Sequence, residues 1–121
     1  MFVRPADVVI PSSQKIFVDK LVAIIEKNID NEEFSVEMLC DEIGMSRTQL
    51  HRKVKAVTNQ SASEFIRNFR LQKAAELLKQ DAGNIAEISY QVGFGSQAYF
   101  TKVFQEVYKT TPLDYKKQHT R

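Results

Sequence analysis

Cysteine and histidine are scarce in this sequence, which has one cysteine, Cys40, and two histidines, His51 and His119, among its 121 residues. A single cysteine cannot form a disulfide within the chain, and these three residues do not have the spacing of a zinc site. We therefore expect neither a structural metal nor a cofactor. Cys40 falls in an apolar-periodic stretch, which favours a small buried hydrophobic residue over a reactive thiol.

Long apolar runs are also missing. No run approaches the roughly 20 residues needed to span a bilayer, and Arg4, Pro5 and Asp7 interrupt the start, where a secretory signal would be continuously apolar. We therefore expect a cytoplasmic, nucleoid-associated protein in which this segment makes no contact with a membrane. The chain is long enough to bury a core without disulfide or metal support.

Charge is distributed unevenly, although the formal net charge is only +2. Residues 1–42 contain four Lys or Arg against nine Asp or Glu, whereas residues 43–121 contain thirteen against six. A positive excess of this kind favours a polyanionic partner for the later part of the chain. Basic faces are often merely solvated, so charge by itself does not identify the partner.

Helix starts are marked repeatedly. A Ser or Asn followed three residues later by an acid or amide indicates a capping box, and three pairs fit: Ser46 with Gln49, Ser61 with Glu64, and Asn84 with Glu87. Thr111, Pro112 and Asp114 have the order of an N-cap, a first-position proline and a first-turn acid. With the stretches that open after Ser13, Ser35 and Ser96, we predict an all-α fold of seven helices, near 14–29, 36–43, 47–57, 62–80, 85–92, 97–108 and 112–118. The one competing strand signal is at residues 8–10.

An internal repeat organises these helices. A shift of 50 residues superimposes capping and apolar positions: Ser46 on Ser96, Leu50 on Phe100, Val54 on Phe104, Val57 on Val107 and Phe65 on Tyr115. Upstream the shift is 49, so that Gly44 meets Gly93 and the second copy has one additional turn residue, Gly95. Each copy predicts a short helix, a glycine-containing turn and a second helix opened by serine. That is the layout of a helix-turn-helix unit.

The repeat predicts four segments. We expect an N-terminal arm or linker at 1–13, a first helix-turn-helix subdomain at 14–60, a linker helix at 61–80 and a second helix-turn-helix subdomain at 81–121. A helix of that linker's length is about 30 Å long. Successive major-groove faces on one side of B-DNA are roughly 34 Å apart, so the spacing favours contacts with two adjacent grooves.

In the helix after Ser46, the spacing of Leu50, Val54 and Val57 predicts a buried stripe. The opposite face then presents Thr48, His51, Arg52 and Lys55. No acid occurs in residues 46–57, as expected of a surface that approaches phosphates. The arginine of this face can pair with guanine, and its threonine and histidine can contact base edges. A solvated face with incidental charges is the alternative, and this helix alone does not decide between them.

The helix after Ser96 is expected to bury Phe100, Val103, Phe104 and Val107 and to expose Ala98, Thr101, Lys102 and Gln105. Gln97 and Lys102 are the hydrogen-bonding candidates of this less charged face, Ala98 can pack on a thymine methyl group, and Thr101 fits a phosphate contact. For Tyr99 we favour partial burial, with its hydroxyl reaching the backbone, over base readout.

A longer pattern carries a family resemblance. Its positions are RLQKAAELL at 70–78, IAEI at 85–88, VGF at 92–94, Ser96, Tyr99-Phe100, Phe104, Thr111-Pro112 and Tyr115. The earlier IGMS at 43–46, Leu50 and SEFI at 63–66 form a first copy. Over residues 17–118 the chain resembles the C-terminal DNA-binding region of AraC/XylS-type transcription regulators, which has two helix-turn-helix units joined by a long helix.

The resemblance implies double-stranded DNA and RNA polymerase as partners. It implies that the base-facing side chains are Thr48, His51 and Arg52 on the first recognition helix and Gln97, Ala98 and Lys102 on the second. We assign phosphate contacts to Arg47, Lys53, Lys55, Ser46, Ser96 and Thr101. Asn59 and Lys109 replace the glycine that usually follows each recognition helix. Lysine costs about 1 kcal/mol in the left-handed conformation, so we expect a strained or differently closed turn at Lys109.

Residues 4–11, RPADVVIP, resemble the connector that precedes this module in regulators fused to two-component signalling machinery, including hybrid sensors. This implies a covalently linked receiver or sensor domain outside the chain.

The sequence thus predicts a transcription regulator that binds specific duplex DNA through recognition helices in two adjacent major grooves. A helical protein-interaction module that binds an acidic partner through its basic face is the alternative, and the groove-matched repeat argues against it. An enzyme is not expected, because there is no nucleophile-base constellation, metal set or phosphate-cradling glycine loop.

Overall fold

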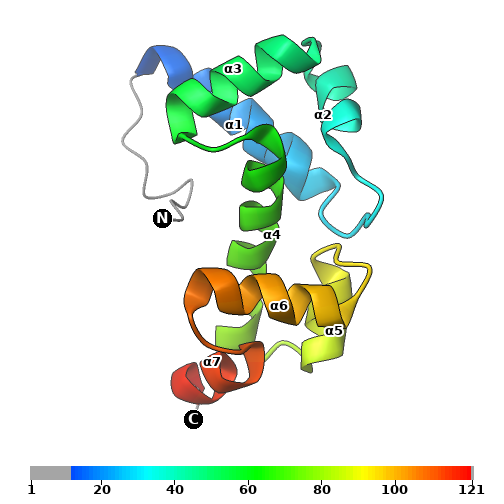
Figure 1. Cartoon of the computed structure of the whole chain (residues 1–121), viewed down its shortest axis with the longest axis vertical. Coiled ribbons are helices and arrows are strands. Elements are labelled where there is room, and N and C mark those ends of the chain that lie inside the picture. Colours follow the sequence, from blue (N-terminus) through cyan, green and yellow to red (C-terminus); the bar gives the residue numbers. More distant parts are fainter. Residues whose placement is uncertain (1–11, 121) are drawn as a thin grey trace. The chain divides into compact units, whose positions relative to one another are not determined.

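The computed structural model describes residues 12–120. Within this range the chain has seven helices and no strand (Figure 1): α1 (Ser12–Lys27), α2 (Val36–Ile43), α3 (Arg47–Thr58), α4 (Ala62–Lys79), α5 (Ile85–Gln91), α6 (Gln97–Tyr108) and α7 (Pro112–His119). The all-α prediction is confirmed, with every helix end within two residues of its predicted position. None of these helices is long and apolar enough to cross a membrane. The strand signal at 8–10 and the connector at 4–11 lie outside the described residues.

The capping motifs place the helix starts. The Ser46 hydroxyl accepts a hydrogen bond from the Gln49 amide at 3.2 Å, and Gln49 Oε1 accepts one from the Ser46 amide at 3.0 Å. The other two predicted boxes form the same reciprocal bonds: Ser61 with Glu64, and Asn84 with Glu87. Single caps come from Ser35, Ser96 and Thr111. Each motif satisfies amides that the helix itself leaves unpaired, so its effect is local and readable from sequence.

Helix α1 is the one whose position the sequence misjudged, because it starts at Ser12 and stops at Lys27 instead of Ile29. The Asn28 amide donates to the Ile25 carbonyl at 3.1 Å, which tightens the last turn. The Asn28 side chain also donates to the Ile24 carbonyl at 2.9 Å. The chain is therefore turned out of the helix at Asn28.

The described residues form two compact units. The N-terminal unit comprises residues 12–28 and Glu33–Phe69, and the C-terminal unit comprises Ile29–Glu32 and residues 70–120. In the N-terminal unit α2 packs against α1 and α3, and in the C-terminal unit α6 packs against α5 and α7 (Figure 1). This division differs from the four segments expected from the repeat. Helix α4 is shared between the units instead of standing apart, and a short segment after α1 joins the C-terminal unit.

The two units have separate cores, and each buries both aliphatic and aromatic side chains. The N-terminal core has Leu21, Ile25, Leu50 and Val54 completely buried, together with Phe65 and Phe69, and Cys40 is buried with them as predicted. The C-terminal core is built around aromatic rings at centroid distances of 5.2 Å for Phe94 and Phe100, 5.6 Å for Phe100 and Phe104, and 5.4 Å for Phe104 and Tyr115. Tilted and edge-on rings at these distances attract one another in addition to burying apolar surface.

The predicted stripe of α3 needs one correction. Val57 is only half-buried, and the residue after it, Thr58, is buried instead. The Thr58 hydroxyl donates to the Val54 carbonyl at 2.7 Å and accepts from the Gln60 amide at 3.2 Å. A buried threonine is acceptable here because both of these local bonds satisfy its hydroxyl.

Arg70 is a buried charge whose guanidinium donates to three backbone carbonyls. Its Nη1 donates to the carbonyl oxygens of Ile29 and Val92, each at 2.6 Å, and its Nη2 donates to that of Asn31 at 2.9 Å. Burial lowers the pKa of the guanidinium, and the Asp30 carboxylate opposes this shift. Because an unpaired buried charge would be costly, these three carbonyls fix the Ile29–Glu32 segment and the end of α5 relative to α4 within the C-terminal unit.

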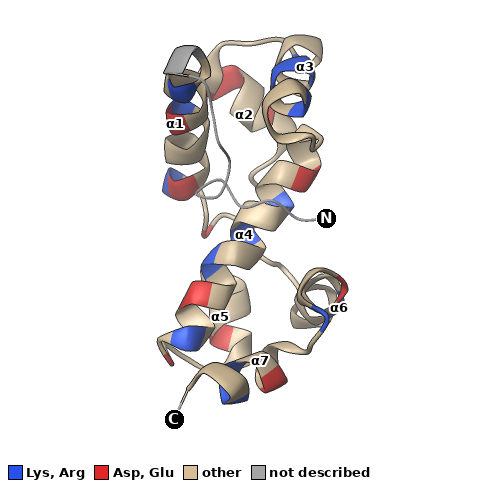
Figure 2. Cartoon of the chain, turned by 90° about the vertical axis from the view of Figure 1, so that its left-hand side faces the viewer, with Lys and Arg blue, Asp and Glu red and all other residues tan. Residues whose placement is uncertain are grey.

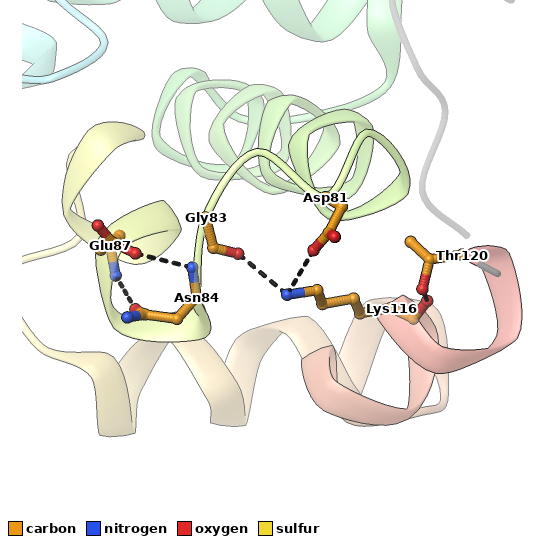
Figure 3. Close-up of polar contacts among 6 residues, drawn as sticks. All are labelled: Asp81, Gly83, Asn84, Glu87, Lys116 and Thr120. Carbon is orange, nitrogen blue, oxygen red and sulfur yellow. Dashed lines mark hydrogen bonds and ion pairs between the residues drawn. The ribbon is translucent and has the colours of Figure 1, made fainter.

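Lys116 fastens α7 to the loop between α4 and α5. Its Nζ lies 2.8 Å from Asp81 Oδ1 and donates to the Gly83 carbonyl at 3.2 Å (Figure 3). The same loop leads into the capping box of Asn84 and Glu87 (Figure 3). Lys116 therefore holds the start and middle of the loop, and the capping box holds its end.

Gly93 is required by the Arg70 contact. Its φ is +89°, and a Cβ at this position would collide with the Arg70 guanidinium and the Ile29 carbonyl. We predict that Gly93→Ala lowers the free energy of unfolding by about 3 kcal/mol or more, from backbone strain plus overpacking. All four tyrosines lie in the C-terminal unit, so urea unfolding followed by tyrosine fluorescence reports on it.

Gly44 provides the matched control, because its φ is +75° but a Cβ there would meet no atom within 4 Å. Gly44→Ala should lower the free energy of unfolding only by the cost of backbone strain, about 1–2 kcal/mol. Far-ultraviolet circular dichroism measures this unfolding. Equal losses for the two variants would contradict the close-approach explanation.

Lys109 and Asn59 close their helices in the same way. Both are left-handed, with φ of +61° and +59°, and their amides donate to Gln105 and Lys55 carbonyls at 2.9 Å. The turn at Lys109 is thus closed normally, with the strain in its φ angle. We predict that Lys109→Gly stabilises the C-terminal unit by about 1 kcal/mol in the tyrosine-monitored assay. Asn59→Gly should change stability by less, since asparagine tolerates this conformation; a destabilised Lys109→Gly variant would refute the assignment.

Candidate nucleic-acid interface

The exposed face of α3 lines a groove together with the start of α4. The groove-lining side chains of α3 include Arg47, Thr48, His51, Arg52 and Lys55, and Ser61 and Ser63 come from the beginning of α4. All five of these α3 residues are exposed, as the periodicity predicted for each of them except Arg47, for which it made no prediction. Helix α3 carries four cationic side chains and no acid (Figure 2). The face therefore combines hydrogen-bonding groups with a positive field, which suits base edges and phosphates.

Two predicted phosphate ligands of α3 have partners within the N-terminal unit. Arg47 Nη1 lies 3.9 Å from Glu37 Oε1, and both side chains are mostly exposed. An exposed ion pair of this length contributes little, so Arg47 is free to exchange its partner. The Lys53 ammonium lies 5.1 Å from the centroid of the Phe17 ring of α1. Lys53 is therefore directed to a different side of α3 from the groove.

The exposed face of α6 has a depression lined by Ala98, Thr101, Lys102, Gln105 and Glu106. Gln97, Ala98 and Lys102 are exposed as predicted, but Thr101 is only partly so. Tyr99 is half-exposed and its ring centroid lies 6.0 Å from that of Phe94. The expected bond from its hydroxyl to the backbone is not formed with any residue between 12 and 120.

The first turns of α3 and α6 offer further contacts. The Ser46 and Ser96 hydroxyls accept from the amides of Gln49 and Tyr99, each at 3.2 Å. Accepting these bonds leaves each hydroxyl hydrogen able to donate to a phosphate oxygen. The remaining first-turn amides and the helix dipole also favour an anion at these positions.

The two faces differ strongly at equivalent positions of the repeat. Along one ridge of each helix, the α3 residues Arg47, His51 and Lys55 correspond to Gln97, Thr101 and Gln105 of α6. Along the neighbouring ridge, Thr48, Arg52 and Ala56 correspond to Ala98, Lys102 and Glu106. The α3 positions thus carry three permanent cations and no acid, whereas those of α6 carry one of each (Figure 2).

Sequence reasoning missed three groups at these faces. It did not assign Ser61 and Ser63, which only the return of the chain into α4 brings beside α3. It also passed over Glu106. The alignment of the repeat could have revealed this residue, because it pairs Glu106 with Ala56. Among the described residues there is no group of three or more His, Cys, Asp or Glu side chains that could hold a metal ion.

Most of the chain is similar to known proteins. Residues 39–118 match a family described as a helix-turn-helix domain. The chain is 42% identical over 118 residues to histidine kinase P4 of Formosa agariphila, an alignment that covers 98% of the chain but 9% of that kinase. It is 34% identical over 105 residues to the regulatory protein SoxS of Escherichia coli, covering 87% of the chain and 96% of SoxS.

The fold is similar to a solved transcriptional regulator with an AraC-type DNA-binding domain from Chromobacterium violaceum. The TM-score is 0.80 and the identity 27%, with 90% of the chain and 96% of that protein covered. The chain spans about a third of the length of several other regulators that it matches, 31% and 34% in two of them.

Proposed function

The chain belongs to the AraC-type family of helix-turn-helix domains, and from that premise we propose that it regulates transcription by binding specific sequences in duplex DNA. In this proposal α3 and α6 are the recognition helices and enter adjacent major grooves. The observation that carries it is the repeated pair of exposed, hydrogen-bonding faces, each on the second helix of a helix-turn-helix unit.

We assign base contacts to Thr48, His51 and Arg52 on α3 and to Gln97, Ala98 and Lys102 on α6. Arg52 pairs best with guanine, whose N7 and O6 accept two parallel hydrogen bonds. Phosphates contact Arg47, Lys55, the two capping serines and the exposed side of Thr101. Lys53 contributes at the edge of the interface, because its ammonium lies over Phe17.

The work of this chain is binding DNA and not catalysis, since the groups on both faces suit bases and phosphates. The alignment that covers almost the whole chain covers only 9% of a histidine kinase. We propose that the chain is the output module of a longer signalling protein, with a covalently linked receiver or sensor domain. It acts in the cytoplasm on chromosomal DNA and communicates with RNA polymerase.

Salt dependence tests DNA binding directly. Titration of the chain with a random-sequence duplex at several salt concentrations should show a steep loss of affinity, because bound phosphates release counterions. Lys55→Ala should reduce the magnitude of the logarithmic slope by about 1. Lys20→Ala is the control, since Lys20 is an exposed cation of α1 outside both faces. A flat response would instead favour a protein-interaction module.

Arg52 tests sequence recognition. Arg52→Ala should weaken binding to the selected site by about 1–3 kcal/mol and relax the preference at one base pair, because a two-bond contact to guanine is lost. Binding sites are first selected from a random library with the unaltered chain, and affinities are then measured on single-base variants of that site. An equal loss on every sequence would reassign Arg52 to a phosphate contact.

A further inference from the structure

Glu106 is the one acidic side chain on the two faces assigned to DNA. It is exposed and lies one helical turn after Lys102 on the ridge that begins at Ala98, in the same depression. It forms no hydrogen bond or ion pair with any residue in the described range. Its carboxylate is therefore open to whatever occupies the α6 face.

Charge interactions within the helix do not account for Glu106. It lies in the last turn of α6, where a negative charge opposes the helix dipole, and that turn contains no basic residue. Its order relative to Lys102 is also the less favourable one for an ion pair one turn apart. At the equivalent turn of α3 the chain carries Lys55, which the dipole favours.

A carboxylate on this face distinguishes two kinds of DNA contact. It repels phosphate oxygens, which dominate binding to unrelated sequences. In the major groove it can accept hydrogen bonds only from exocyclic amino groups, which cytosine and adenine present there. The same side chain thus weakens sequence-independent binding and tolerates binding where such an amino group faces it.

We propose that Glu106 is a specificity-determining residue of α6, which penalises phosphate contact and selects a cytosine or adenine amino group in the major groove. This inference rests on the proposed function and assigns the two faces different tasks. The α3 face supplies most of the sequence-independent attraction, and the α6 face supplies discrimination.

The test compares the whole chain with Glu106→Gln, which removes the charge, and Glu106→Ala, which also removes the acceptor. Each is titrated at one salt concentration with a random duplex and with the site selected by the unaltered chain. Glu106→Gln should bind the random duplex about threefold or more tightly. Its ratio of specific to random affinity should fall about fivefold or more. Site selection with Glu106→Ala should lose one preference for cytosine or adenine.

Two controls separate local from general charge effects. Glu26→Gln makes the same change in net charge at an exposed side chain of α1 and should leave the ratio of specific to random affinity unchanged. The reciprocal Ala56→Glu places a carboxylate at the equivalent position of α3 and should weaken binding to the random duplex. An unchanged or increased ratio in Glu106→Gln, or unaltered base preferences in Glu106→Ala, overturns the inference. If the unaltered chain does not prefer its selected site, the proposed function itself fails.

Discussion

The C-terminal unit depends on the hydrogen bonds that the buried guanidinium of Arg70 donates. It collects three carbonyl oxygens from two segments, Ile29 and Asn31 after α1 and Val92 after α5. Loss of any one of these acceptors would be costly, because it would leave a buried charged donor without a hydrogen bond. The space that the guanidinium needs also restricts the turn before α6, where only a glycine at position 93 leaves room for it. The turn that leads to α6 is thus constrained by a charge on α4.

The repeat preserves helix caps and apolar core positions, whereas many of the exposed side chains differ. N-caps lie at equivalent positions, Ser35 and Asn84, Ser46 and Ser96, and Ser61 and Thr111, so equivalent helices begin in the same register. A shared register means that the same positions face outward in both copies. Leu50 and Val54 of the N-terminal core correspond to the larger Phe100 and Phe104 of the C-terminal core, and the outward-facing positions remain equivalent. This is why two units of one fold can present surfaces of such different charge.

The charge difference separates attraction from discrimination. Cations near phosphates bind any duplex, whereas hydrogen bonds to base edges depend on the sequence. The α3 face has groups of both kinds, and the α6 face has few charges and an acid. In the proposed function, the α3 face therefore contributes most of the attraction to any duplex, and the α6 face contributes discrimination between bases.

Local motifs were determined by the sequence alone. Capping residues bond within three positions and helical periodicity assigns faces, so the seven helices and the exposed groups at Thr48, Arg52 and Lys102 followed from the chain itself. The tertiary structure decided what depends on distant partners. Arg70 binds carbonyls about 40 and 20 positions away, and the Lys53 ammonium lies over the Phe17 ring. Sequence order carries no record of these contacts, because they exist only once packing has brought the segments together and burial has made each unpaired polar group costly.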